Sequence, residues 1–217
     1  MKLAVLSDTH GLLRQAVLER LRGVDAILHG GDINNAGILH TLEAMAPVRV
    51  VRGNNDKEWA EGIPEALDFE LSGVRIYMTH KKKDLPGDLS PYGLVVYGHS
   101  HRYEEGRAGE TVLLNPGSCG PRRFNQAVTM AMVYISEARE IRVERVDIPN
   151  EPTRTVKLPS DLRSQIEAVV RETRKGRPVF EIAGRYGLDA ALVEQIARLY
   201  LTHPGVDVEG IMAKMGV

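Results

Sequence analysis

The chain has 217 residues, of which 43% are hydrophobic and 26% are charged, a composition typical of a folded protein rather than of a long disordered one. Its 28 Lys and Arg are balanced by 29 Asp and Glu, so it has no overall positive charge with which to hold nucleic acid or an anionic membrane. Its start lacks a leader-like apolar segment, no apolar run reaches membrane-spanning length, and the single cysteine, Cys119, cannot form an internal disulfide. We therefore expect a cytoplasmic protein without a membrane partner.

Strand-like and helix-like stretches alternate through the first quarter of the chain. In chain order they occupy residues 2–6, 12–21, 26–28, 38–45 and 48–51. The first, third and fifth are short apolar runs, and the second and fourth are amphipathic. This β-α-β-α-β alternation predicts a mostly parallel sheet with helices packed on it.

Strand patterns dominate from residue 66 onward. The predicted strands cover residues 67–71, 74–78, 94–97, 103–107, 111–114, 128–135 and 141–148. Ser72 and Gly73 separate the first two of these strands and form a hairpin signal, and Gly109 marks a second turn. The second half of the chain therefore predicts a more antiparallel sheet.

Helical periodicity replaces strand periodicity near residue 150. The predicted helical segments are 162–170, 179–186, 192–201 and 208–215. Residues 182–196 match the helix-turn-helix pattern, with Gly187 suited to a left-handed turn between two helices. We therefore divide the chain into a domain of residues 1–150 and a helical extension of residues 151–217, with a linker at about 150–159.

The charge of the extension disfavours nucleic-acid binding. From residue 151 onward it contains 10 Lys and Arg against 9 Asp and Glu. The exposed positions of its would-be recognition helix are poor readers of phosphate or bases: Asp189, Ala190, Ala191, Glu194, Gln195 and Arg198. We expect the extension either to form a homo-oligomer or to cover part of the active-site edge.

Five short polar motifs each follow directly on a predicted strand. They are Asp8-Thr9-His10, Gly31-Asp32, Gly53-Asn54-Asn55-Asp56, His80 and Gly98-His99-Ser100-His101. In open α/β sheets the carboxyl ends of the strands form one edge, so we expect these side chains to converge there. Oxygen and imidazole donors without a thiolate suit a pair of divalent metals such as Mn, Fe, Zn, Ni or Co.

The order of these motifs, D-x-H, G-D, G-N-x-D, H and G-H-x-H, resembles the calcineurin-like metallophosphoesterases. The segment Asn115-Pro116-Gly117-Ser118, which we expect to shape the turn beneath the site, resembles the small bacterial and archaeal phosphodiesterase branch that also includes the eukaryotic retromer subunit of this fold. The resemblance covers roughly residues 1–150. It implies an α/β fold, a four-layer α/β/β/α sandwich of two mixed sheets, here with a small all-helical C-terminal extension. It also implies hydrolysis of a small phosphodiester at a dinuclear metal centre.

The resemblance further implies roles for single residues. Asp8, His10 and His101 would hold the first metal, and Asn54, His80 and His99 the second. Asp32 would bridge the two, and a metal-bridging hydroxide would be the nucleophile. The residues expected to take part in catalysis are Asp8, His10, Asp32, Asn54, Asn55 and His99. The remaining histidines His29, His40 and His203 fit no ligand position.

One position departs from the family pattern. Many relatives have a histidine at the third position of G-N-x-D, where it is thought to protonate the leaving group, whereas this chain has Asn55. An amide cannot act as a general acid near neutral pH, so we expect substrates with acidic leaving groups to react faster.

Other interpretations of the sequence remain open. A phosphomonoesterase of the same fold is the nearest alternative, and a protein-binding scaffold is the alternative from another class. The run Lys81-Lys82-Lys83 and the pair Arg122-Arg123 could bind phosphate or could simply be solvated surface.

Overall fold

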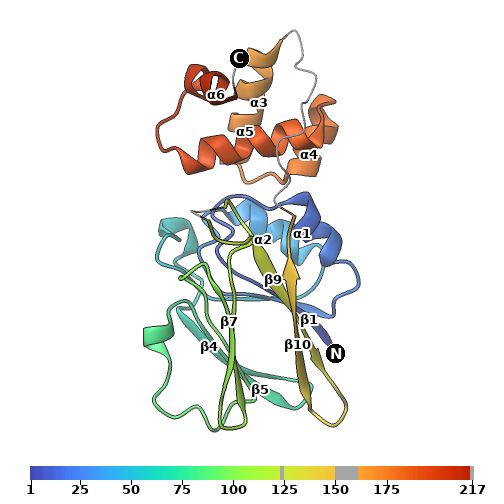
Figure 1. Ribbon diagram of the computed structural model, residues 1–217, viewed down its shortest axis with the longest axis vertical. Helices are drawn as coiled ribbons and strands as arrows, with labels where there is room; N and C mark the ends of the chain where they lie inside the picture. The colour runs from blue at the N-terminus through green and yellow to red at the C-terminus, as the bar shows by residue number, and fades with distance from the viewer. Residues whose placement is uncertain (123–124, 150–160, 216–217) are drawn as a thin grey trace.

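The computed structural model describes residues 1–122, 125–149 and 161–215 (Figure 1). Two sheets of five strands lie at one end of the molecule, and the four C-terminal helices form a group at the other end. Helices α1 (Gln15–Arg20) and α2 (Ala36–Glu43) lie between the sheets and this group. The chain thus places its predicted domain and its predicted extension at opposite ends.

The first sheet combines both ends of the predicted domain. Its strands, in spatial order, are β10 (Ile141–Asp147), β9 (Thr129–Ile135), β1 (Lys2–Leu6), β2 (Ala26–His29) and β3 (Val48–Val50). β1, β2 and β3 are parallel, as their alternation with helices predicts, whereas β9 is antiparallel to β1. The last two predicted strands pair antiparallel with each other, as the more antiparallel second half predicts, and β9 also pairs with β1, so both strands belong to the first sheet.

The second sheet is mixed. Its strands, in spatial order, are β4 (Ala66–Leu71), β5 (Val74–Thr79), β6 (Leu94–Val96), β8 (Thr111–Pro116) and β7 (Tyr103–Ala108). The predicted hairpin turn is confirmed, with φ of 49° at Ser72 and 74° at Gly73. Only the β4–β5 and β7–β8 pairs are antiparallel, and β6 runs parallel to both of its neighbours.

Two apolar cores hold these layers together. Leu3, Val5 and Leu28 of the first sheet pack with Ile76 and Val96 of the second, and this cluster joins the two sheets face to face. The opposite face of the first sheet packs on α1 and α2 through a cluster that includes Leu6, Ile27, Val17 and Ile38. The chain is therefore the predicted α/β sandwich of two mixed sheets. On the second sheet's side the helical layer is thin, since the segment from β4 to β7 contains only the 3-10 helix η2 (Lys82–Asp84).

The C-terminal helices form a third apolar core. They are α3 (Leu162–Arg174), α4 (Val179–Tyr186), α5 (Ala190–Thr202) and α6 (Val208–Met215). Gly187 ends α4 in the left-handed conformation with φ of 62°, as the helix-turn-helix pattern predicts. Leu12 of the first domain belongs to the same core. The predicted linker at 150–159 lies outside the described residues, and so does Arg123.

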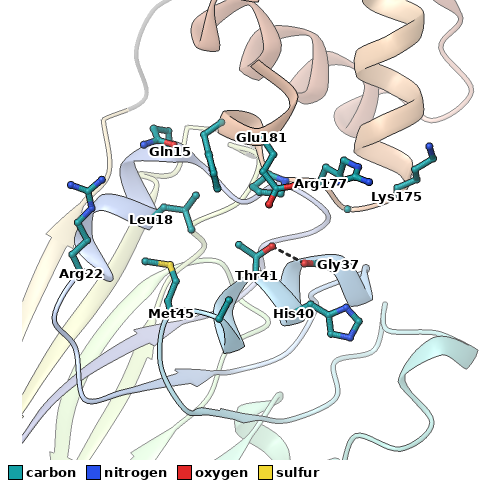
Figure 2. Close-up of a pocket in the computed structure, with 14 residues that line it drawn as sticks. Gln15, Leu18, Arg22, Gly37, His40, Thr41, Met45, Lys175, Arg177 and Glu181 are labelled. Carbon is teal, nitrogen blue, oxygen red and sulfur yellow. Dashed lines mark hydrogen bonds and ion pairs between the residues drawn. The ribbon is translucent and has the colours of Figure 1, made fainter. Parts of the chain in front are cut away.

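A cavity of about 590 Å³ lies where the helical extension meets α1 and α2 (Figure 2). Leu18 and Thr41 line it from the first domain, and Phe180 and Glu181 line it from α4. None of the predicted metal ligands is among its lining residues, so the chemistry predicted from the sequence must lie elsewhere. Among the described residues, no helix is both long enough and apolar enough to span a bilayer.

Candidate metal centre

The five polar motifs follow strands that run in the same direction within each sheet. Motif residues come after β1 (Asp8, His10), β2 (Asp32), β3 (Asn54, Asn55), β5 (His80) and β6 (His99, His101). The structure brings six of the seven predicted ligands into two groups, Asp8, His10 and His101 in one and Asp32, His80 and His99 in the other. Within each group the possible ligand atoms all lie within 4.8 Å of one another. The convergence predicted from strand ends is therefore confirmed for these six residues.

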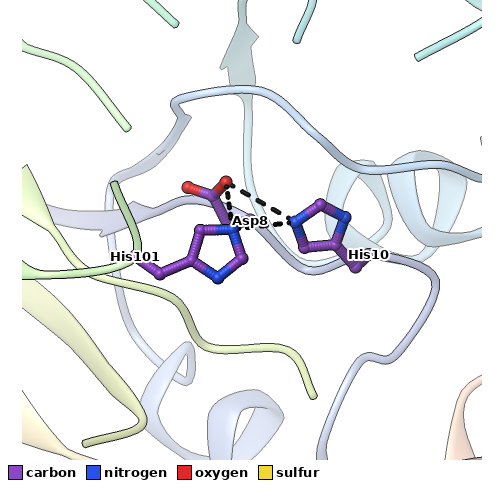
Figure 3. Close-up of side chains that lie close together, drawn as sticks. All are labelled: Asp8, His10 and His101. Carbon is purple, nitrogen blue, oxygen red and sulfur yellow. Dashed lines mark hydrogen bonds and ion pairs between the residues drawn. The ribbon is translucent and has the colours of Figure 1, made fainter. Parts of the chain in front are cut away.

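Three possible metal-ligand atoms of the first group face one another (Figure 3). The Nε2 atoms of His10 and His101 are 3.1 Å apart. Asp8 Oδ1 lies 3.2 Å from His101 Nε2 and 3.6 Å from His10 Nε2. Among the described residues Asp8 Oδ1 is buried and receives no hydrogen bond. A carboxylate oxygen and two imidazole nitrogens aimed at one point fit a divalent cation, which would satisfy all three atoms at once.

The second group contains His80, whose Nδ1 atom already has a hydrogen-bond partner. His80 Nδ1 donates a hydrogen bond of 2.7 Å to the carbonyl oxygen of Gly30, so Nε2 is the atom that would bind a metal. His80 Nε2 is buried, faces Asp32 Oδ2 at 3.4 Å and has no hydrogen-bond partner in the described chain. The ring of His99 packs edge-on against that of His80, with centroids 5.2 Å apart. Burial disfavours a charge on His80, but Asp32 raises its pKa, so without a metal the two side chains form an ion pair, and a metal ion would take the place of the imidazole proton.

Asp32 lies between the two groups. Its Oδ2 atom is 3.4 Å from His80 Nε2 and 3.7 Å from His10 Nε2. The backbone N–H of Asn55 donates to Asp32 Oδ1 and the side-chain amide of Asn55 donates to Asp32 Oδ2, both at 2.7 Å. Burial alone would raise the pKa of Asp32, but His80 and Asn55 lower it to about 2. The carboxylate is therefore held ionised in a fixed orientation.

The other aspartate is fixed from behind. Asp8 Oδ2 accepts hydrogen bonds from Ser7 Oγ at 2.5 Å and from the backbone N–H of His99 at 3.1 Å. Burial alone would raise the pKa of Asp8, yet the imidazoles of His10 and His101 hold it below its usual range. Behind this pair, burial lowers the pKa of His29 to about 4, and its Nε2 lies 3.2 Å from Thr9 Oγ1. His29 is thus a neutral supporting residue of the loop that carries Asp8 and His10.

Most of the predicted ligands have unusual backbone conformations. Positive φ angles occur at Asp8 (55°), His10 (44°), Asp32 (56°), His99 (70°) and His101 (59°). Non-glycine residues avoid this region, and such strain is found mainly at functional sites, where the surrounding structure enforces it. The loops therefore sacrifice local backbone stability to aim these side chains inward.

The predicted supporting segment lies directly beneath the site. Asn115 Nδ2 donates to the carbonyl oxygen of Gly98 at 2.8 Å, and its Oδ1 accepts from Gly117 N–H at 2.9 Å. Ser118 Oγ donates to the carbonyl oxygen of Asp8 at 2.8 Å. The expectation that residues 115–118 shape the turn beneath the site is therefore confirmed.

Asn54 is the seventh predicted ligand, and it differs from the Asp and His residues of the two groups in offering an amide. Its side chain is exposed and, with His80, lines a cavity of about 290 Å³ beside the second group. Its role as a metal ligand stays a prediction. Lys81 lines the same cavity, whereas Lys82 is paired with Glu104 at 2.9 Å and points its charge elsewhere.

Asp56 is a residue for which the sequence suggested no role. It is 2% exposed, its Oδ1 accepts from Asn34 N–H at 2.7 Å and its Oδ2 accepts from Gly53 N–H at 2.9 Å. These bonds tie the loop after β2 to the loop after β3. Asp56 is the last residue of the G-N-x-D motif, and that position could have pointed to a structural role.

The family model for the calcineurin-like phosphoesterase superfamily domain matches residues 1–138. A probable metallophosphoesterase of Methanothermobacter thermautotrophicus is 31% identical over 163 residues, which cover 69% of this chain and 95% of that protein. The phosphodiesterase YfcE of Escherichia coli is 31% identical over 156 residues, which cover 58% of this chain and 84% of YfcE.

Solved structures show the same fold. A structure of YfcE, described as a phosphoesterase from E. coli, matches 69% of this chain and all of that chain, with a TM-score of 0.52 and 25% identity. Vps29 from Entamoeba histolytica, in complex with Zn²⁺, also matches 69% of this chain and all of its own, with a TM-score of 0.54 and 23% identity. The matched family segment ends at residue 138, before the C-terminal helices begin.

Proposed function

Because this chain belongs to the calcineurin-like phosphoesterase superfamily and is a metal-dependent phosphoesterase, we propose that it hydrolyses phosphodiesters with two divalent metal ions bound at the rim of its sheets. The observation that carries the proposal is the position of Asp32. One oxygen of this carboxylate lies within 4 Å of an imidazole from each of the two groups. That placement suits a ligand shared by two cations.

When bound, the cations would activate water for attack on phosphorus and neutralise charge on the phosphoryl oxygens. Mn, Fe, Zn, Ni and Co all suit these oxygen and imidazole donors. The predicted division of the ligands supplies three residues for each ion in addition to Asp32. They are Asp8, His10 and His101 for one ion and Asn54, His80 and His99 for the other. The predicted nucleophile stays a prediction.

The chain's own residues fix the donors in advance. Asn55 holds both oxygens of Asp32, Gly30 sets the protonated nitrogen of His80, and Ser7 orients Asp8. Such outer contacts keep ligands in one geometry and raise metal affinity. Ready-made geometry of this kind favours catalysis over a scaffold role, since a protein-binding surface has no need of buried, strained and charged side chains.

The preference for diesters rests on the relatives named as phosphodiesterases and on Asn55. The Asn55 amide is bound to Asp32, so this residue offers no proton to a leaving group. Hydrolysis of monoesters is the nearest alternative activity.

Metal analysis combined with a substrate panel tests the proposal. We expect about two divalent ions per chain and faster turnover of bis(p-nitrophenyl) phosphate than of p-nitrophenyl phosphate. Asp32→Ala should lower both metal content and rate, whereas Asp88→Ala, which removes an exposed carboxylate, should change neither. A chain that stays inactive with added Mn, Ni, Zn and Mg would favour the scaffold alternative.

A further inference from the structure

The helical extension forms one wall of a cavity beside the first ligand group. This cavity has a volume of about 760 Å³. His10 and Asn34 line it from the first domain, and Arg198 and His203 line it from α5 and the residue that follows α5. Because His10 belongs to the candidate metal centre, a molecule bound to the metals would extend along the surface of α5.

Specific contacts fix α5 in this position. Arg14, which is 1% exposed, forms an ion pair with Glu194 of α5 and donates from Nε to the carbonyl oxygen of Gly120 at 3.1 Å. At Gly11, a β-carbon would lie 3.1 Å from Leu201 Cδ2, so the loop that carries His10 lies directly against the end of α5. The wall is thus built into the fold.

The charge of this cavity is one-sided. Arg122, Arg198 and His203 line it, and its described lining residues include no Asp or Glu. Within the described chain neither Arg122 nor Arg198 forms an ion pair with a carboxylate, and Glu194, the acidic neighbour one turn away, is engaged by Arg14. Arg122 Nε donates to the carbonyl oxygen of Gln126 at 3.2 Å, which helps to hold its guanidinium in place.

His203 is also held in one orientation. Its Nδ1 lies 3.0 Å from the carbonyl oxygen of Leu199, and a proton on Nδ1 satisfies that oxygen. With Nδ1 engaged in this way, Nε2 can donate to an anion only in the imidazolium form, so the two arginines supply the fixed positive charge of the cavity.

The cavity on the other side of the centre differs in charge. Beside His80 and Asn54 it contains Arg52 and Lys81, but also the carboxylates of Glu65 and Asp84. A diester has two ester arms, and an anionic arm would meet opposing carboxylates in this cavity. Of these two cavities, the one beside α5 combines nearness to the centre with positive charge that no lining carboxylate offsets.

We propose that the cavity formed by Arg122, Arg198 and His203 is an anion-binding subsite, so that the preferred substrate is a phosphodiester with a further phosphate on one ester arm. This inference rests on the proposed function. Arginine side chains match phosphate with paired N–H donors, which makes a phosphate the anion that this site suits best. The extension thereby selects the substrate, although it supplies none of the predicted metal ligands.

Two diesters that share a p-nitrophenyl group test the subsite. One carries a 2-methoxyethyl arm and the other a 2-(phosphonooxy)ethyl arm. In the metal-loaded enzyme we expect kcat/KM to be at least about tenfold higher for the phosphorylated diester, since its added phosphate would accept charged hydrogen bonds from the two arginines. Arg198→Gln and Arg122→Gln should each reduce this preference by about tenfold, and Arg198→Lys should reduce it less.

Arg185→Gln is the matched control, because Arg185 is exposed on α4 and does not line the cavity. It should leave the preference intact. Equal kcat/KM values for the two diesters in the unaltered enzyme, or a preference unaffected by both Arg122→Gln and Arg198→Gln, would overturn the proposal.

Binding of inorganic phosphate to the metal-free protein separates this inference from the proposed function. Calorimetry should show binding that Arg198→Gln weakens about tenfold and Arg185→Gln leaves unchanged. If no diester is hydrolysed with any metal but this pattern is seen, the proposed function fails and the subsite stands. If Arg198→Gln binds phosphate as tightly as the unaltered chain, the subsite is refuted whatever the activity.

Discussion

Asn55 orients a predicted metal ligand from a position that is expected to supply a proton donor in many relatives. At the position where many relatives are expected to carry an acid, this chain has an amide that binds both oxygens of Asp32. The residue is therefore a positioning residue for the central carboxylate. Replacing Asn55 should therefore weaken metal binding rather than remove a proton donor.

Asn55→Ala is expected to weaken metal binding about 10- to 100-fold, because it removes the side-chain hydrogen bond that orients Asp32. Titration with Zn²⁺ or Mn²⁺ measures the change. Asn55→Asp should be worse than Asn55→Ala, since it places a second carboxylate against Asp32. Undiminished metal affinity in Asn55→Ala would show that Asp32 needs no such support.

The missing acid at Asn55 makes a separate kinetic prediction. Across a series of aryl and alkyl methyl phosphodiesters, kcat/KM should fall steeply as the pKa of the leaving group rises, because no proton is supplied at that position. Equal rates across the series would mean that another group protonates the leaving oxygen.

Turns between elements bring the two groups of ligands close together. Gly98 follows β6 at the point where the chain passes Ser7 and Asp8, and a β-carbon there would lie 2.0 Å from Ser7 Oγ and 2.8 Å from Asp8 Oδ2. The short approach leaves no room for a side chain. The loop that holds His99 and His101 can pass this close to Ser7 and Asp8 because residue 98 has no side chain.

Gly98→Ala should lower the free energy of unfolding by about 1–3 kcal/mol through overpacking and should also weaken metal binding. Urea denaturation and metal titration check the two effects. Gly106→Ala in β7 is the matched control, because a β-carbon there meets nothing within 4 Å. That change should stay within about 0.5 kcal/mol. Similar losses in both variants would contradict the tight approach at Gly98.

Glu172 makes the helical extension sensitive to acid. Its carboxylate lies 3.0 Å from Lys175 Nζ and 2.6 Å from Arg177 Nε, and Lys175 is the main cause that lowers its pKa from 4.5 to about 2. A carboxyl with a lower pKa in the folded chain stabilises the fold above the unfolded value, and this contribution disappears as the pH falls from 4.5 toward 2.

Glu172→Gln should therefore reduce stability at pH 7, and the difference from the unaltered chain should shrink as the pH falls through that window. Helical circular dichroism during urea unfolding at several pH values measures it. Glu167→Gln, at an exposed position without an ion pair in the described chain, should show little difference at any pH. A constant gap for Glu172→Gln would mean that its charge is not what stabilises α3 and α4.

At the scale of the whole molecule, the contacts that join the extension to the first domain include the ion pair of Arg14 with Glu194, the apolar contact at Leu12, and a hydrogen bond from Asn35 Nδ2 to the carbonyl oxygen of Arg174. Glu194→Gln would leave the buried guanidinium of Arg14 without its counter-charge, and should cost about 1–3 kcal/mol. Faster hydrogen exchange in α5 than in β1 would localise the loss to the docking surface. The exposed pair of Arg163 and Glu209 offers a control, since Glu209→Gln should cost less than about 1 kcal/mol. Equal effects would show that Arg14 and Glu194 do not hold the extension.

Local signals explain what could be predicted. Each of the five motifs stands at the end of an apolar run, and parallel strands bring such ends to one rim whatever their separation in sequence. The helices at 179–186 and 208–215 were also visible, because their apolar spacing has the helical period. The hairpin at Ser72 and Gly73 was equally local, since both residues suit positive φ.

Long-range pairing explains what could not be predicted. Nothing in the alternation of β9 shows that it pairs with β1 rather than with a strand near it in sequence. Likewise, Arg198 and His203 looked like surface residues of a helical unit, because their neighbourhood to His10 arises only when α5 docks. The spacing of apolar residues shows which face of a helix or strand is apolar, but it does not show which other element covers that face.

The loop that bears Asp8 and His10 continues without a break into Gly11 and Leu12, which pack against the helices of the extension. Metal binding at the edge of the sheets and docking of the C-terminal helices therefore both depend on the same short stretch of backbone. By reciprocity, any ion that steadies the seated helices is itself held more tightly, by the same factor, once they are seated. The extension would then contribute to the retention of metal as well as to the choice of substrate.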